Sequence, residues 1–250
     1  GYELESVFGL NDVSATEEEC YWMGKKNRIY ANSSWLKKFL FRLVYRHRQY
    51  DKTKPDFANI FYKDVFNTNK SYFSGWWANE LYFQGISDTV KRLYKFPKLD
   101  QKNLDFLRLI EKKETVSLHV RRGDYLYQEN YFFSKICTDK YYKNAIEFMN
   151  KKISKPLFII FSNDIGWCKE YFKQGEYFFV DWNKGKMSYR DMQLMSLCKH
   201  NIIANSSFSW WGGYLNGNKN KIVCSPTRMM NIREPIRGEF PDEWIRIDSI

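Results

Sequence analysis

The pattern that most constrains this fold is a regular alternation of short apolar segments with longer amphipathic segments between residues 115 and 225. Short apolar runs predict buried strands, and the amphipathic segments between them predict helices. A chain of this kind forms βαβ units, in which helices cover both faces of a parallel sheet. The predicted strands are Thr115–Arg121, Pro156–Ser162, Tyr177–Asp181, Asn201–Ala204 and Lys221–Cys224, and the predicted helices are Lys140–Lys151, Asp164–Phe172, Ser188–Cys198 and Ser207–Leu215.

Residues 1–114 differ in composition and pattern, because they are rich in aromatic and basic residues and mostly show helical periodicity. We therefore predict an N-terminal domain over 1–114, a sheet domain over 115–225, and a tail over 226–250 that packs back on the domains. Within the first domain, Trp35–Arg48 carries an apolar stripe at helical spacing and a basic opposite face. Such a helix either docks on an anionic membrane or, as is commoner, packs on a domain core.

Composition narrows the class of protein. Hydrophobic residues make up 44% of the chain and aromatic residues 19%, which predicts a packed core rather than a disordered chain. The net charge of +11 favours an anionic partner. The five cysteines form no C-x-x-C pair, which argues against zinc and favours free thiols in the cytoplasm. We find no signal peptide, no apolar run of membrane-spanning length, no P-loop and no Asp-x-Asp motif of metal-dependent sugar transferases.

The first candidate motif follows the first predicted strand. Ligands bind beyond the carboxyl ends of parallel strands, and here lie His119, Arg121 and Arg122, followed by Gly123 and Asp124. Because side chains alternate along a strand, His119 and Arg121 share a face and Arg122 points away from them. Arginine forks match phosphate oxygens, so the motif suits a diphosphate. The alternative is structural: an ion pair of Arg122 with Asp124, beside a core histidine.

The second motif, Phe161-Ser-Asn-Asp164, ends one strand and opens a helix. Asp164 either caps that helix or accepts the adjacent N–H groups of a guanine. The third motif runs from Asn201 to Gly213 and again joins a strand to a helix. The N-terminus of a helix is a natural phosphate site, and Ser206 and Ser207 add hydroxyl donors there. The Trp210-Trp-Gly-Gly213 run indicates close packing of the helix on the sheet.

Together these segments resemble the GDP-fucose-dependent α-1,2-fucosyltransferases, above all the bacterial members. The matching stretches, in chain order, are 72–83, HVRRGDY at 119–125, FSNDIGWC at 161–168 and SLCKHNIIANSSFSWWGG at 196–213. The resemblance implies an α/β, GT-B-like arrangement of two Rossmann-like domains, with GDP-fucose on the second. It implies an inverting, metal-independent transfer of fucose to a galactose-terminated oligosaccharide or lipid-linked glycan. No cofactor and no nucleic acid is expected.

The resemblance also implies roles for residues. Arg121, His119 and Asp124 form the predicted catalytic group, with Arg121 on the β-phosphate. The predicted donor-binding residues are His119, Arg121, Arg122, Asp164, Asn205, Ser206, Ser207 and Phe208. On the acceptor side we predict Trp76, Trp77 and Glu80. Asp124 and Glu80 are both candidates for the base, and Asp124 is alternatively a structural partner of an arginine.

One departure from the family concerns the N-terminus. The family opens with a strand and a Gly-Gly-Leu-Gly-Asn-Gln-type turn, and nothing similar precedes Leu4. The chain therefore looks incomplete at this end. Alternative functions are an α-1,6- or protein O-fucosyltransferase of the same superfamily, and a non-catalytic GDP- or glycan-binding protein. We expect a cytoplasmic protein, with the inner face of a bacterial membrane as a peripheral location.

Overall fold

The chain divides into two compact units, Gly1–Trp77 and Ala78–Ile250. The computed structural model describes residues 4–10, 34–36, 61, 63, 66, 77–127, 131–231 and 236–248. In the described part of the first unit, α1 spans Leu4–Phe8, and the ring centres of Phe61 and Phe66 lie 6.1 Å apart. The predicted helix Trp35–Arg48 lies almost wholly outside the described residues, and so does the architecture of a first Rossmann-like domain.

The second unit is built on a six-stranded parallel sheet with the strand order β3-β2-β1-β4-β5-β6. The strands are β1 (Glu114–Val120), β2 (Pro156–Ser162), β3 (Tyr177–Phe179), β4 (His200–Ile202), β5 (Val223–Pro226) and β6 (Ile245–Ile247). All five predicted strands are confirmed, as is the α/β, Rossmann-like class. The chain builds outward from β1 to β3 on one side and then returns to place β4 on the other side of β1. The sheet therefore has its topological switch point between β1 and β4.

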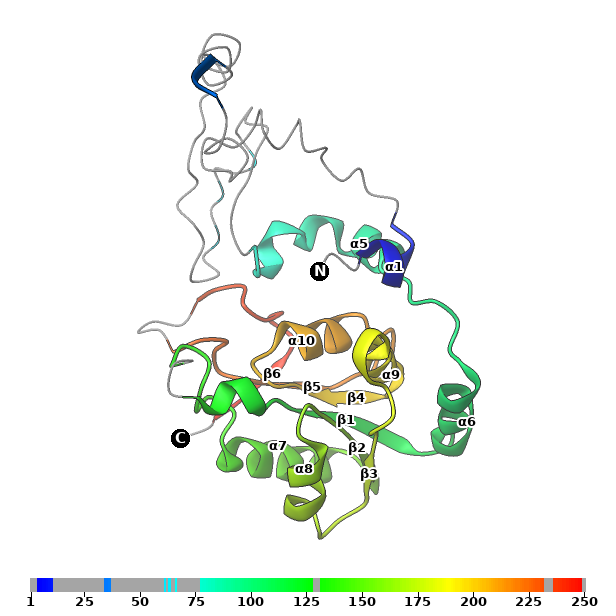
Figure 1. The fold of residues 1–250 in the computed structure, drawn as a ribbon. Coiled ribbons are helices and arrows are strands. Elements are labelled where there is room, and N and C mark those ends of the chain that lie inside the picture. The colour runs from blue at the N-terminus through cyan, green and yellow to red at the C-terminus, as the bar shows by residue number, and fades with distance from the viewer. Residues whose placement is uncertain are drawn as a thin grey trace. The chain divides into compact units, whose positions relative to one another are not determined.

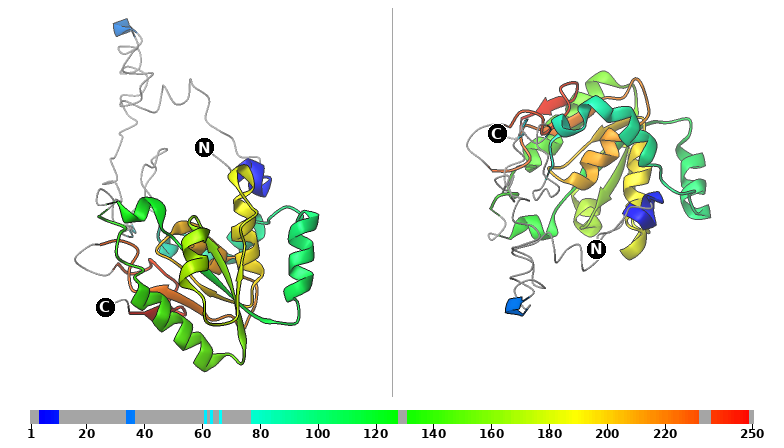
Figure 2. Two further views of the ribbon diagram at one scale, coloured as in Figure 1. Left: turned by 60° about the horizontal axis from the view of Figure 1, so that its bottom comes forward. Right: turned by 90° about the horizontal axis from the view of Figure 1, so that it is seen from above.

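Helices cover both faces of this sheet (Figure 1). The apolar side of β1, formed by Val116, Leu118 and Val120, packs with α7 and α8 in one core. The opposite face of the sheet packs against α9 and α6 in a second core, and α6 lies at one margin of the unit in both views of Figure 2. The helices of this unit are α5 (Ser87–Leu93), α6 (Gln101–Ile110), α7 (Asp139–Lys152), α8 (Ile165–Tyr171), α9 (Tyr189–Leu197) and α10 (Ser207–Tyr214), with 3-10 turns η2 (Glu80–Tyr82), η3 (Gln84–Ile86), η4 (Gly123–Leu126) and η6 (Gly185–Met187).

Local sequence signals explain where three of these helices begin. The side chains of Asp100, Thr138 and Asp164 each accept a hydrogen bond from a backbone N–H in the first turn of α6, α7 and α8. This satisfies donors that would otherwise lack a partner at the start of a helix. The four predicted helices of the sheet domain are all confirmed, and two of them, α7 and α8, begin at such a cap.

The double glycine of α10 allows the close packing that the sequence predicted. A Cβ atom at Gly212 would lie 2.9 Å from the Cβ of Met195 on α9, and one at Gly213 would lie 3.3 Å from Val223 of β5. The outer side of α10 is covered by aromatic side chains from the start of the unit. Phe83 stacks on Trp211 at 5.8 Å, and Tyr94 packs on the same ring at 5.0 Å. The fold thus holds α10 tightly against the sheet.

Two features differ from the predicted domain boundaries. The sheet unit begins at Ala78 rather than at residue 115, because α5 and α6 belong to it. Residues 226–250 are also more than a packing tail, since β6 extends the sheet beside β5. Arg246 stabilises this return by donating to the carbonyl oxygens of Phe240, Pro241 and Trp244. Within the described ranges, no helix is long and apolar enough to cross a membrane.

Candidate functional site

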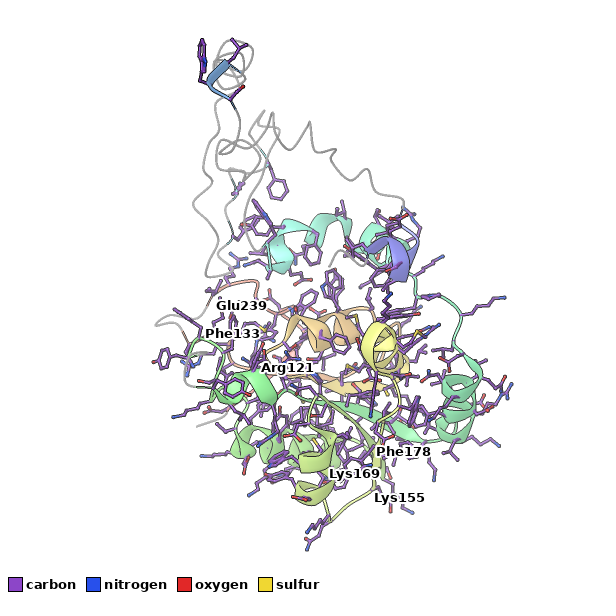
Figure 3. The ribbon with its side chains drawn as sticks, in the orientation of Figure 1. Arg121, Phe133, Lys155, Lys169, Phe178 and Glu239 are labelled. Carbon is purple, nitrogen blue, oxygen red and sulfur yellow. The ribbon has the colours of Figure 1, made fainter. Side chains whose placement is uncertain are left out.

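The candidate site lies at the carboxyl ends of β1 and β4, where the strand order switches. The register pairs Leu118 with Ile202, so the residues that follow each strand come next to each other. The hydroxyl of Tyr125 donates to the backbone oxygen of Asn205 at 3.2 Å, which joins the two strand ends directly. In Figure 3, Arg121 and Phe133 lie close together at this edge of the sheet. The first and third sequence motifs are therefore brought together.

His119 is buried on the face of β1 that looks toward α10. Its ring centre lies 5.8 Å from that of Phe208, and only 4% of the residue is exposed. Burial, and then the charge of Arg121, lower the pKa of His119 to about 3, so its imidazole is neutral at physiological pH. Among the described residues, none forms a hydrogen bond with its buried Nδ1. A buried polar atom of this kind is costly unless a ligand or water satisfies it.

Arg121 follows directly after β1, and its charge helps to lower the pKa of His119, whereas a shared face of the two side chains stays a prediction. Its Nη2 atom is 2.9 Å and 3.0 Å from the two carboxylate oxygens of Asp124, and its guanidinium lies over the Tyr125 ring at 5.3 Å. The Nε atom is buried, with no hydrogen-bond partner in the described part of the chain. Asp124 is thus an ionic partner of an arginine. The arginine is Arg121, so the alternative ion pair of Arg122 with Asp124 is wrong.

Arg122 joins the first motif to the second. Its Nε is 3.2 Å from a carboxylate oxygen of Asp164, and its guanidinium lies 3.8 Å from the centre of the Trp167 ring. Asp164 also accepts a hydrogen bond from the backbone N–H of Trp167. It therefore caps α8, which is one of the two roles that the sequence predicted for it. Contact of Asp164 with guanine stays a prediction. Arg122 is held by contacts within the protein, and its role as a support for the donor site stays a prediction.

The N-terminus of α10 faces the same switch point. Ser206 is the N-cap residue, and its side chain accepts no capping hydrogen bond, so the first N–H groups of the helix are left for another acceptor. Ser207 is exposed and begins the helix. Asn205 is used differently, because its amide donates to the carbonyl oxygens of Phe133 and Met229. Its amide nitrogen therefore ties loops together at the site.

The predicted acceptor-side residues stay a prediction as a group, because they are divided between the two units. Trp76 lies outside the described residues, and Trp77 belongs to the first unit, where its φ angle is +51°. Glu80 is buried in the second unit, and its backbone N–H donates to the oxygen of Gly238. Burial raises the pKa of Glu80, and the acidic side chains of the segment before β6 raise it further. Its role as an acceptor base stays a prediction.

The described residues enclose one small cavity at this site. A cavity of about 50 Å³ lies beside Arg121 and Arg122 and is closed by Tyr142 and Trp167. This volume suits a water molecule, whereas organic ligands occupy several hundred Å³. Across the described ranges, no three His, Cys, Asp or Glu side chains gather in a way that could hold a metal ion.

The sequence did not indicate a role for Asn163, although this residue lies in the second motif beside Asp164. Its side chain bonds to both the backbone N–H and the backbone oxygen of Arg122. The sequence signal that could have identified Asn163 is its position directly after β2. Because β2 is paired with β1 along its whole length, the residue after β2 lies beside the residues that follow β1. Tyr125 was missed as well, although it lies within the first motif.

A Rossmann-like sheet whose switch point presents an arginine, a buried histidine and an uncapped helix N-terminus defines a class: α/β proteins that bind phosphate-bearing ligands at the strand ends. Comparison with known proteins narrows this class. The chain belongs to glycosyl transferase family 11, whose sequence profile matches residues 26–248. The resemblance to α-1,2-fucosyltransferases is thereby confirmed at the level of the family.

Three relatives illustrate the similarity. The chain is 34% identical over 184 residues to an alpha-1,2-colitosyltransferase of Escherichia coli, which covers 71% of this chain and 62% of that protein. It is 40% identical over 141 residues to the O-antigen biosynthesis glycosyltransferase WbnK of Escherichia coli, covering 56% and 46%. It is 28% identical over 141 residues to human galactoside alpha-(1,2)-fucosyltransferase 1, covering 54% and 38%. The chain thus spans less than two thirds of the length of each relative.

Proposed function

We propose that this chain carries the donor site of an inverting α-1,2-fucosyltransferase. The enzyme would move L-fucose from GDP-fucose to the 2-hydroxyl of a terminal galactose on an oligosaccharide or lipid-linked glycan. The observation that carries the proposal is the meeting of Arg121, His119 and the α10 N-terminus at the switch point. A buried nitrogen of each side chain has no hydrogen-bond partner among the residues that the structure describes. Family membership supports the reaction class.

The proposed chemistry centres on the departing diphosphate. Attack by the acceptor oxygen forms a bond to the anomeric carbon of fucose, while the bond from that carbon to the β-phosphate oxygen breaks. Negative charge then grows on GDP, and preorganised donors in the protein stabilise it. Arg121 would contribute a cation, and the first N–H groups of α10 would contribute a helix N-terminus. His119 would contribute a neutral hydrogen bond. No metal is required by this scheme.

The proton of the acceptor hydroxyl needs a destination. Asp124 is a weak candidate because the Nη2 atom of Arg121 contacts both its oxygens. Glu80 has a raised pKa, which makes a carboxylate a stronger base, and its surroundings are α5 and the segment before β6. We favour the structural role for Asp124 and leave Glu80 as the candidate base.

A second candidate concerns the sugar that is transferred. The most extensive of the three alignments is with a protein named for transfer of colitose, with an α-1,2 linkage. This favours colitose as the alternative to fucose on the same donor site. Location at the inner face of a bacterial membrane, where a lipid-linked acceptor would be met, completes the proposal.

A calorimetric titration of this chain with GDP, UDP and ADP in the presence of EDTA tests the donor site. We expect GDP to bind with micromolar affinity and the other two nucleotides to bind at least tenfold more weakly, a difference of about 1.4 kcal/mol. Equal affinity for all three, or loss of binding in EDTA, contradicts the proposal. Incubation with GDP-fucose or the corresponding colitose donor and a galactoside, followed by linkage analysis of the product, then distinguishes the sugars and the α-1,2 linkage from α-1,6.

A further inference from the structure

Asn163 clamps the backbone at the point where the chain leaves β1. Its Oδ1 atom accepts from the backbone N–H of Arg122 at 2.9 Å, and its Nδ2 atom donates to the backbone oxygen of the same residue at 3.2 Å. The last paired residues of the two strands are Val120 and Ser162. The Asn163 side chain therefore takes the place of one further rung of the β1–β2 ladder, using an amide group that mimics a peptide.

The clamp is needed because the backbone turns sharply here. Gly123 follows with a φ angle of +60°, in the left-handed region that other residues adopt only at a cost. A Cβ atom at this position would lie 2.6 Å from the Nδ2 atom of Asn163. The absence of a side chain at Gly123 thus serves both the turn and the close approach of Asn163.

The residues on either side of the clamp are those of the candidate site. Arg121 precedes the clamped peptide groups, and its ionic partner Asp124 follows the turn. The side chain of Arg122 is fixed separately on α8, by Asp164 and the Trp167 ring. Among the described residues, Asn163 is the only hydrogen-bond partner of the Arg122 N–H and the only side chain that bonds to the Arg122 oxygen. That oxygen also accepts from the backbone N–H of Tyr125.

We infer that Asn163 is a positioning residue for Arg121: it holds the Arg122 peptide groups so that the Arg121 guanidinium is aimed at the diphosphate. This inference rests on the proposed function for its ligand and on the structure for the clamp itself. Both polar atoms of the Asn163 amide are occupied by the backbone, which leaves Arg121 as the group that meets the nucleotide.

Amide hydrogen exchange of the whole chain, read by NMR at Arg122, tests the clamp without any ligand. Asn163→Ala should speed exchange of this amide about tenfold, the effect of losing a hydrogen bond of roughly 1.4 kcal/mol. Asn163→Asp retains an oxygen acceptor and should restore much of the protection. Asn218→Ala is the matched control, because Asn218 also joins backbone segments, bonding to Lys199 and Asn220 at the opposite edge of the sheet. Unchanged exchange in Asn163→Ala overturns the inference.

GDP titration of a double-mutant cycle then separates positioning from direct contact. Asn163→Ala should weaken GDP binding about tenfold, and Asn218→Ala should leave it unchanged. Combined with Arg121→Gln, Asn163→Ala should add nothing further, because its effect passes through Arg121. Losses that multiply mean that Asn163 touches the nucleotide itself, which refutes a positioning role. If the unaltered chain fails to bind GDP, the proposed function falls, while the exchange measurement still decides the clamp.

Discussion

The ion pair between Arg121 and Asp124 leads to opposite effects when either partner is neutralised. If Arg121 binds the diphosphate, Asp124 competes with the ligand for the same guanidinium. Arg121→Gln should therefore weaken GDP binding, and Asp124→Asn should strengthen it. A pair whose only purpose is structural would give no such difference in sign.

The magnitudes follow from exposure. The two side chains are 33% and 47% exposed, and pairs of this kind contribute about 0.2–1 kcal/mol. Release of Arg121 in Asp124→Asn should thus tighten GDP binding by up to about fivefold. A charge-assisted hydrogen bond contributes about 1.5–3 kcal/mol, so Arg121→Gln should weaken binding about 10- to 100-fold. Neither change should lower the free energy of unfolding by more than about 1 kcal/mol.

Calorimetry with GDP measures the affinities, and urea unfolding measures the stability of the same variants. The control is the pair of Arg108 and Asp105 on α6, which has the same i,i+3 spacing and a 3.0 Å contact but lies away from the site. Neutralising either control residue should leave GDP affinity unchanged. Unaltered GDP affinity in Arg121→Gln would refute the assignment of the phosphate contact, and weaker binding in Asp124→Asn would refute the competition.

Three further outcomes are expected. His119 has a pKa of about 3 in the folded chain and about 6.5 in the unfolded chain, so its contribution to stability is complete above pH 6.5 and is lost as the pH falls. Urea unfolding should show a fall in the free energy of unfolding between pH 7 and pH 5, of which His119 accounts for about 2 kcal/mol. His119→Gln should remove this part, and an identical fall in the variant contradicts the prediction. Gly123→Ala should cost at least about 1 kcal/mol of stability and also weaken GDP binding, because the added Cβ meets Asn163 in a left-handed turn. Normal GDP affinity by calorimetry would show that GDP binding does not depend on this turn. Lys221→Met should lower the free energy of unfolding by about 1–3 kcal/mol in urea, since the ammonium donates to the oxygens of Gly213, Tyr214 and Asn216 at the end of α10. A smaller change would mean that water satisfies these oxygens when the ammonium is removed.

Much of the fold could be predicted from sequence because its signals are local. The apolar runs that became β1 and β2, and the caps at Thr138 and Asp164, act over a few residues. The strand β6 escaped prediction because Ile245–Ile247 is short and lacks an apolar run. Its identity as a strand depends on pairing with β5, which no local pattern reports.

The candidate site shows the same division. Sequence alone predicted His119 and Arg121 on one face of a strand and Arg122 on the other, because side chains alternate with a period of two. In the structure β1 ends at Val120, so this alternation reaches His119 and the two arginines follow the strand. The sequence also located every motif at a strand end. Only the tertiary structure decided which carboxylate each arginine meets: Arg121 pairs with Asp124, and Arg122 pairs with Asp164, which is 42 residues away. The clamp by Asn163 was decided in the same way. The physical reason is that alternation belongs to one strand, whereas the partner of a side chain depends on which strands the fold makes neighbours.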